Sequence, residues 1–302
     1  MTRNLLVPID FKPESLTALD YAVSLAASIQ ADIHLLYVIE IENPLLKMVL
    51  TGEQRELIIE GARKKINTLV KEKSGASGRV FHEHILQGKI YDKIVDTAVA
   101  IKAEMIIMGR KDSSDMVKNF TGANTLHIIR ESNIPVITLK REIALTGSRH
   151  ILLPLDLSKQ VLKQVCSSVR IAHLLSAKIS IVSVLPVDRA SVEISYSVRL
   201  NELRELFEKS GINCNYKLIK DTSPDLPVIL NNYAREIKAD LLITMTQQEL
   251  NFTEYFIGSV AQEIINKSDV PVLSITPTIE EYETVPDEFI TKLVDPINIL
   301  KY

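Results

Sequence analysis

The sequence predicts an α/β protein made of two tandem copies of one doubly wound unit, each with a five-stranded parallel sheet. Short apolar runs alternate with segments whose apolar residues recur at helical spacing, which is typical of strands joined through helices. The pattern of residues 103–139 also recurs further along the chain, where Gly258 matches Gly122 and Pro271 matches Pro135, a common offset of 136. A fixed offset that keeps a glycine, a proline and the apolar pattern indicates an internal repeat.

The first copy reads as strand and helix in strict alternation. Pro8 ends the first strand, because proline lacks the N–H that a ladder needs, and Pro13 suits the first turn of a helix that runs to about Gln30. The pair Ser74-Gly75 is a helix-stop signature that predicts the end of a long second helix. Apolar runs predict strands at 5–7, 33–39, 80–86, 105–108 and 136–139, and apolar stripes predict helices at 13–30, 58–74, 90–101 and after 122.

The second copy repeats this order and is shorter. Strands are predicted at 151–154, 179–185 and 214–219 before the repeated final pair, with helices through 162–172, around 203–207 and through 226–237. Pro154 follows Pro8 by 146 positions instead of 136, so ten residues are missing between the second and fourth strands of the second copy. We expect the second helix to be the shorter element, and residues 141–149 to form the linker.

Composition and charge exclude several classes of protein. With 302 residues, 46% hydrophobic and 24% charged, the chain is expected to form about two globular domains. Residues 277–302 hold 2 Lys and 6 Asp or Glu, so they account for the negative net charge of −3 of the whole chain, and neither half has the basic excess of a nucleic-acid-binding protein. No apolar run reaches membrane-spanning length or forms a secretory signal. Cys166 and Cys214 are expected to be reduced structural thiols, and we expect a cytoplasmic protein.

Several short motifs stand at matching places in the two copies. They are Val7-Pro8-Ile9-Asp10 and Leu153-Pro154-Leu155-Asp156 after the first strands, Phe256-Ile257-Gly258-Ser259-Val260-Ala261 at the last helix, and Pro135-Val136 with Pro271-Val272. Together these motifs resemble the universal stress protein family. The resemblance implies an adenine nucleotide alpha hydrolase-like fold with strand order 3-2-1-4-5. It also implies that the last strands of two units meet. In this chain the two copies would form an intramolecular pseudo-dimer, and two chains could in addition form a homodimer. The expected domains are 1–140 and 149–276, followed by a C-terminal extension, 277–302.

The resemblance places a ligand crevice at the carboxyl ends of the strands where the strand order reverses, with Asp10 opposite Gly109. The candidate ligand-binding residues are Pro8, Asp10, Val38, Gly109, Arg110, Gly122 and Ala123 in the first copy and Asp156, Val184, Gly258 and Ser259 in the second. Asp10 and Asp156 could orient an adenine or ribose, or could cap loop amides. The two roles are compatible.

Nucleotide-binding members of the family carry a loop of the form Gly, two residues, Gly, nine residues, Gly, then Ser or Thr. In the first copy Asp112 occupies the middle glycine position and Ala123 the hydroxyl position. A carboxylate repels a triphosphate, and its β-carbon hinders close backbone approach. In the second copy Met245 and Gln248 replace both earlier glycines. We therefore expect ATP or another adenine nucleotide to bind weakly or not at all.

Other groups have a plain structural interpretation beside the functional one. The glycines at 122 and 258 could simply let a helix pack closely on the sheet, which we favour for the second copy. His82 and His84 could bind a metal as a pair, but a half-buried strand face is the expected interpretation and no metal site is predicted. The pair Arg110-Lys111 could meet an anion, although adjacent basic residues after a strand are usually surface residues.

The resemblance thus implies a cytoplasmic universal stress protein that acts as a small-ligand-binding or regulatory module of the stress response, with degraded nucleotide-binding loops. The first alternative is an ATP-binding protein with slow hydrolysis that uses Gly109, Gly122 and Asp10. The second is an interaction scaffold without a ligand. Phosphate-loop, dinucleotide and serine-hydrolase motifs are not found in the sequence. No catalytic residue is assigned, and the apolar content of the extension predicts that it docks on the protein or on a second copy.

Overall fold

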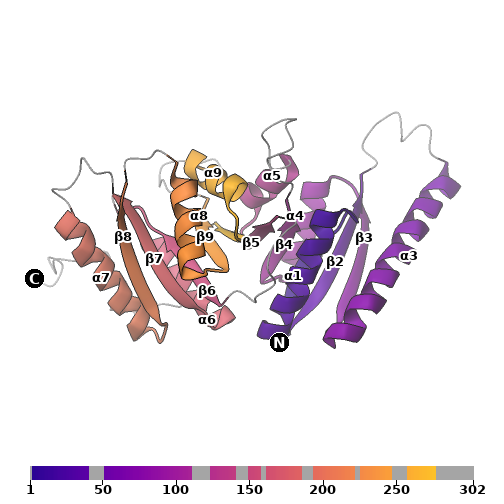
Figure 1. Cartoon of the computed structure of the whole chain (residues 1–302). Helices are drawn as coiled ribbons and strands as arrows, with labels where there is room; N and C mark the ends of the chain where they lie inside the picture. The colour runs from indigo at the N-terminus through magenta and orange to yellow at the C-terminus, as the bar shows by residue number, and fades with distance from the viewer. Residues whose placement is uncertain are drawn as a thin grey trace, which may run out of the picture. The chain divides into compact units, whose positions relative to one another are not determined.

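The computed structural model describes residues 2–40, 51–110, 123–140, 149–157, 161–185, 193–221, 225–246 and 257–276. The chain divides into two compact units, residues 1–147 and 148–302. Each unit repeats the same alternation of strands and helices (Figure 1). The predicted extension, 277–302, and most of the predicted linker lie outside the described residues.

Unit 1 is a doubly wound α/β unit. Its elements are β1 (Arg3–Pro8), α1 (Pro13–Ile29), β2 (Ala31–Ile39), α3 (Gly52–Ser77), β3 (Phe81–Gln87), α4 (Ile90–Ala100), β4 (Met105–Gly109), α5 (Ala123–Glu131) and β5 (Val136–Leu139). Its strands lie in the order β3-β2-β1-β4-β5 and pair in parallel. The predicted fold and strand order are confirmed.

Unit 2 repeats the architecture with a shorter second helix. Its elements are β6 (His150–Pro154), α6 (Leu162–Leu175), β7 (Lys178–Leu185), α7 (Glu193–Lys209), β8 (Cys214–Lys220), α8 (Leu226–Ile237), β9 (Leu241–Met245), α9 (Ser259–Lys267) and β10 (Val272–Ile275). The strand order is β8-β7-β6-β9-β10, again parallel. Helix α7 has 17 residues and its counterpart α3 has 26, so the expected loss falls on the second helix.

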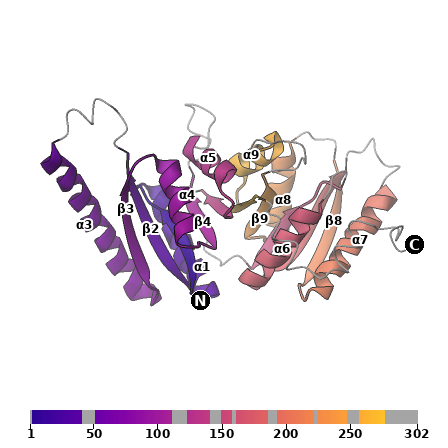
Figure 2. The ribbon, with the colours of Figure 1, turned by 180° about the vertical axis from the view of Figure 1, so that it is seen from behind.

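Helices cover both faces of the sheet in unit 1. In Figure 1 helices α1 and α3 lie in front of the strands, and from behind, in Figure 2, α4 and α5 do. Between these layers the strands are apolar on both sides: Leu5, Leu6 and Val7 of β1 are all 0% exposed. A continuous apolar run is what a parallel strand needs when both of its faces are covered.

The long helix α3 ends later than predicted. It continues through Gly75 to Ser77, and the helix stops at Gly78, whose φ of 63° is left-handed and whose N–H donates to the Ser74 carbonyl. Glycine adopts this conformation at little cost, so Gly78 is the C-cap. The glycine three residues earlier is helical, so the predicted stop at Ser74-Gly75 is wrong by one turn.

Both cysteines are structural, as predicted. Cys166 on α6 and Cys214 on β8 are buried and not bonded to each other. Burial raises the pKa of Cys214 to about 12, with a further rise from Glu208. A thiol that stays protonated near neutral pH is a poor nucleophile. Among the described residues, no helix is long and apolar enough to cross a membrane.

Candidate functional site

Asp10 leaves β1 at the carboxyl edge of unit 1, where it is exposed. Its Oδ1 accepts a hydrogen bond from the Lys12 N–H at 3.1 Å, and Lys12 Nζ lies 2.7 Å from Oδ2. Burial raises the pKa of the Asp10 carboxyl, but hydrogen bonds from Lys12 and Ser15 outweigh it and the net shift is downward. Asp10 is therefore an ionised residue that caps the loop. A ligand that binds its carboxylate would have to displace only the exposed Lys12 side chain, and an ion pair at such a surface is weak.

An aromatic pair, Phe11 with Tyr37, lies next to Asp10 and was not predicted from the sequence. Phe11 has a left-handed backbone (φ 63°), uncommon for a residue with a bulky side chain. Its ring lies 5.2 Å from the Tyr37 ring on β2, and Lys65 Nζ on α3 lies 5.3 Å from the Phe11 ring centroid. Phe11 therefore joins the ends of β1 and β2 to α3. The pairing depends on strand register, which spacing in the sequence does not reveal.

Gly109 is required by packing at the end of β4. A β-carbon there would overlap the backbone carbonyl of Glu14, in the first turn of α1, and would lie 2.9 Å from the Glu14 Cβ. The φ of Gly109 is not left-handed, so space is the constraint here. Asp10 and Gly109 are thus brought to one edge of the sheet, because both adjoin the start of α1. The presence of this glycine is explained by packing and is not itself evidence of a phosphate ligand.

Arg110 is buried, which contradicts its interpretation as a surface residue. It is only 3% exposed, and its backbone N–H donates to the Leu139 carbonyl at 2.8 Å. The adjacent end of β5 therefore fixes its backbone, and the side chain points into the protein. Pro8 and Val38 are half-buried at the ends of β1 and β2. Gly122 lies outside the described residues, as does the side chain of Ala123.

In unit 2 the residue after the first-strand motif is Leu157, in the place of Phe11. Leu157 is 3% exposed, and its carbonyl accepts a hydrogen bond from Arg199 Nη1 at 2.9 Å. The neighbouring Asp156 is exposed, and Val184 is half-buried at the end of β7. Asp156 thus occupies the position of Asp10, but it lacks an aromatic neighbour at position 157.

The end of β9 differs from the end of β4 in one decisive residue. Met245 takes the position of Gly109, and its side chain is 5% exposed. Helix α6 begins at Leu162, which corresponds to Leu16 in α1, one turn inside the start of α1. Thr246, the counterpart of Arg110, is buried and donates its backbone N–H to Ile275 at 3.1 Å. In unit 1 the first turn of α1 therefore lies against the end of β4, whereas in unit 2 the Met245 side chain is buried at the end of β9.

Gly258 does not serve close packing, so our favoured interpretation of it is wrong. A β-carbon on Gly258 would meet no described atom within 4 Å, and its φ of −58° is open to any residue. Gly258 is the N-cap of α9, which has no side-chain cap hydrogen bond, and Ser259 is exposed at the first helical position. Unpaired N–H groups and the helix dipole make such an end favourable to negative charge.

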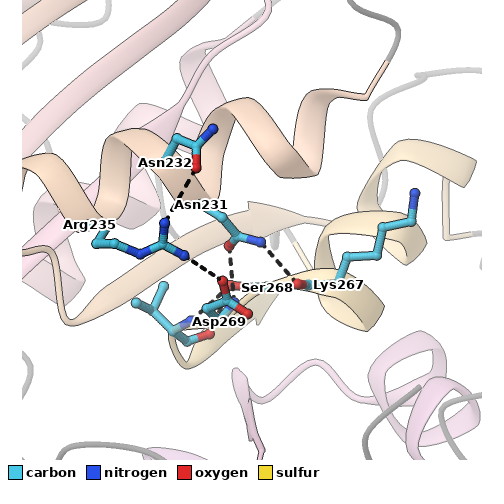
Figure 3. Close-up of polar contacts among 7 residues, drawn as sticks. Asn231, Asn232, Arg235, Lys267, Ser268 and Asp269 are labelled. Atoms are coloured by element: carbon cyan, nitrogen blue, oxygen red, sulfur yellow. Dashed lines mark hydrogen bonds and ion pairs between the residues drawn. The ribbon is translucent and has the colours of Figure 1, made fainter. Parts of the chain in front are cut away.

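Two other polar clusters lie away from these residues. Asn231 on α8 donates to the Lys267 carbonyl and accepts from the Asp269 N–H, while Arg235 contacts Asp269, as Figure 3 shows. This cluster ties α8 to the amino end of β10, opposite the crevice edge, which indicates a structural role. In unit 1, His34 joins His82 and His84 on the sheet. No described group of three or more His, Cys, Asp or Glu residues has metal-binding geometry.

Two doubly wound units with strand order 3-2-1-4-5 define a tandem α/β fold, and comparison with known proteins places it. The model of the universal stress protein family matches residues 1–140 and again 147–275. The chain therefore belongs to the universal stress protein family. A universal stress protein of Methanocaldococcus jannaschii is 24% identical over 142 residues, 46% of this chain and 82% of that protein.

Solved structures show the same fold at low sequence identity. A universal stress protein from Archaeoglobus fulgidus superposes with a TM-score of 0.68 at 18% identity, covering 90% of this chain and 98% of that one. A putative universal stress protein from Pseudomonas aeruginosa gives 0.63 at 18% identity, covering 97% and 96%. The likeness spans both units, so the tandem arrangement recurs in these proteins.

Proposed function

We propose that the chain is a regulatory module of the stress response that binds a small ligand at the carboxyl edge of its sheets and is not a tight ATP binder. One observation carries this proposal. In both units, protein atoms occupy the space beside the position of the first phosphate-loop glycine. In unit 1 these are the backbone atoms of Glu14, which lie against Gly109, and in unit 2 they are the buried side chain of Met245. Neither strand end therefore keeps open space beside its first glycine position.

The proposed ligand positions differ between the units. In unit 1, Asp10 supplies an exposed, ionised carboxylate beside Phe11, suited to hydrogen-bond donors on a flat ligand. In unit 2, the uncapped start of α9 at Gly258 and Ser259 suits an anionic group. Unit 1 would therefore recognise a ligand through donors and stacking, and unit 2 through negative charge. Pro8, Val38, Asp156 and Val184 would line the same edges.

A binding role is favoured over catalysis by the chemistry of the described residues. The carboxylates at the edge, Asp10 and Asp156, are exposed, and Asp10 has a pKa that is lowered. A general base usually has a pKa that its surroundings raise toward neutrality. Slow ATP hydrolysis remains the alternative function, through Gly109, Gly122 and Asp10, and a ligand-free scaffold is the third.

The two cysteines bear on where the protein is located. Two free, buried cysteines suit a reducing compartment, and we place the protein in the cytoplasm.

We further propose that the units form an intramolecular pseudo-dimer through β5 and β10. Each is the outermost strand of its own five-stranded unit and is apolar, and pairing would cover both exposed edges. Small-angle scattering that shows two independently tumbling units would contradict this arrangement.

Native mass spectrometry of the full chain, purified without added ligand, tests the proposed function. We expect a retained small molecule, released on denaturation and identified by its mass. Asp10→Asn and Ser259→Ala should reduce the retained fraction. Ser195→Ala, an exposed serine on α7 outside the edge, is the matched control and should leave it unchanged. Protein that carries no small molecule and binds none from a metabolite extract would support the scaffold instead.

A further inference from the structure

Three histidines gather on one face of the sheet in unit 1, away from the carboxyl edge. His34 lies on β2, paired in register with His82 of β3, while His84 lies two residues further along β3. The His34 ring stacks on His82 at 4.4 Å and on His84 at 5.2 Å between centroids. His34 is 8% exposed, and His84 is half-buried. These side chains occupy the sheet face that α4 covers, because Asn4 links His34 to the end of α4.

The hydrogen bonds fix the proton positions in this cluster. Asn4 Nδ2 donates to the Ile101 carbonyl at 2.6 Å, so its oxygen must face His34 Nε2, 3.2 Å away. Because an amide oxygen only accepts, His34 must carry its proton on Nε2. His34 Nδ1 is then an acceptor, and His84 Nε2 donates to it at 2.9 Å. At neutral pH the chain of donors therefore runs from His84 to His34 to Asn4.

The hydrogen bond between His34 and His84 can survive one added proton but not two. A proton on His84 Nδ1 leaves its Nε2–H bonded to His34. A proton on His34 Nδ1 can share that bond only if His84 gives up its Nε2 proton and becomes the acceptor. With both rings charged, two N–H groups face each other across 2.9 Å, and the bond must break. Protonation of both rings therefore removes the side-chain hydrogen bond that links β2 to β3 at this point.

The strand that carries His82 and His84 is weakly held. β3 is the outermost strand of its unit, pairs only with β2, and has no fully buried side chain. Helix α3 lies beside β3 in Figure 1. A strand with little buried apolar surface opens locally at low cost, so a single side-chain bond to β2 matters.

Burial and the neighbouring histidines favour the neutral state of His34 and His84. The pKa of His34 is lowered from 6.5 to about 4, first by burial and then by His82 and His84, with Asp32 opposing. Burial, followed by His82, also lowers the pKa of His84. His82 Nε2 lies 3.6 Å from Asp32 Oδ2.

The elements packed around the cluster add no closer charge among the described residues. β1 contributes the neutral Asn4. On α4, Asp92 and Asp96 are exposed, and the Lys93 side chain turns toward Gly88, where a β-carbon would lie 2.9 Å from its Cε. Asp32, on β2 itself, is therefore the carboxylate that acts on His34.

We propose that His34, His82 and His84 form an acid-sensitive latch, which holds the edge strand β3 on the sheet near neutral pH and releases it when His34 and His84 are both protonated. The chemistry is proton binding and not metal binding, because the lone pair of His34 Nδ1 is used by His84. Unit 2 lacks the latch: Ser180 takes the place of His34, and Asn215 and Lys217 take the places of His82 and His84. β8 is therefore an internal reference strand.

Imidazole NMR on the full chain with ¹⁵N-labelled histidine tests the proton positions. We expect His34 to remain the Nε2–H tautomer at pH 7 and to charge at least about one pH unit below the usual 6.5. His84→Gln should raise the midpoint of His34, since the Gln carbonyl can accept the new N–H. A His34 that is Nδ1–H at pH 7, or that titrates at 6.5, would overturn the latch. So would Zn²⁺ at one equivalent shifting the His34 and His84 signals together.

Amide hydrogen exchange tests the release of β3. Between pH 7 and pH 5, after correction for intrinsic rates, exchange in β3 should rise about tenfold relative to β8. His84→Gln should abolish this rise, while His173→Gln, an exposed histidine of α6, should preserve it. Equal acceleration of β3 and β8, or an unchanged response in His84→Gln, would refute the proposal.

Discussion

The backbone of Glu14, in the first turn of α1, occupies the space beside Gly109 that a side chain at the end of β4 would need. Glycine at this position therefore follows from the packing of α1. The same strand end in unit 2 carries Met245, whose side chain is buried. The two units therefore pack this strand end differently, with a glycine against the backbone of α1 in unit 1 and a buried methionine side chain in unit 2.

Gly109→Ala should destabilise the protein, because the new methyl group would overlap the Glu14 carbonyl. Overpacking of this kind costs about 1–3 kcal/mol of the free energy of unfolding. Urea unfolding at pH 7.5 measures the loss. Gly61→Ala is the matched control: this glycine lies within α3, with open space around it, and the change should stabilise by about 0.5–1 kcal/mol. Equal effects of the two changes would contradict the packing argument.

Asp10→Asn should barely alter stability while lowering ligand retention. The Lys12–Asp10 pair is 60% and 51% exposed, and such pairs contribute about 0–1 kcal/mol. Because the pKa of Asp10 is lowered, its contribution is present above 3.8 and is lost as pH falls through the folded-state value. Urea midpoints at pH 7 and pH 3 check this. A large loss at pH 7 would make Asp10 a structural residue.

Stability should fall as the pH drops below 6.5. His34, His84 and His150 all have lowered pKa values, with burial as the largest cause. The unfolded chain therefore binds more protons than the folded one from pH 6.5 downward, and for His34 this window reaches about 4. Urea midpoints at pH 7.5 and 5.0 should differ in the wild type and differ less in His84→Gln. A flat profile would show that these rings are accessible.

The double change Asp112→Gly with Ala123→Ser should strengthen ATP binding, if the first loop is a decayed phosphate site. It restores a glycine and a hydroxyl where the sequence has a carboxylate and a methyl group. We expect at least about a tenfold gain in affinity, or roughly 1.4 kcal/mol. Thr17→Ala, on the surface of α1, is the control. No gain would mean that the loop has been rebuilt for a different ligand.

The sequence predicted the fold well because its signals are local. The prolines that end β1 and β6 and the apolar stripes of α1 and α8 each depend on neighbouring residues, and these elements are confirmed. The repeat at a constant offset is confirmed as well, because both units show the same order of strands and helices. The end of α3 was missed because Gly75 and Gly78 both resemble stops. Only the left-handed backbone at Gly78, set by the turn that follows, decides between them.

The candidate site was less predictable, since its properties depend on contacts between distant segments. The burial of Arg110 reflects β5 beside β4, and the pairing of Phe11 with Tyr37 reflects the register of β1 with β2. The third histidine, His34, was missed for the same reason. Alternation of His82 and His84 was visible in one strand, but their partner lies about fifty residues earlier and meets them only through strand pairing.

Titration calorimetry with MgATP, on full-length protein freed of retained small molecules, tests the central claim most directly. In both units, protein atoms occupy the space beside the position of the first phosphate-loop glycine. We therefore predict a dissociation constant much larger than about 1 μM, the value that corresponds to a binding free energy of roughly 8 kcal/mol. A dissociation constant at or below about 1 μM would contradict the account and would make an ATP-binding protein the better description.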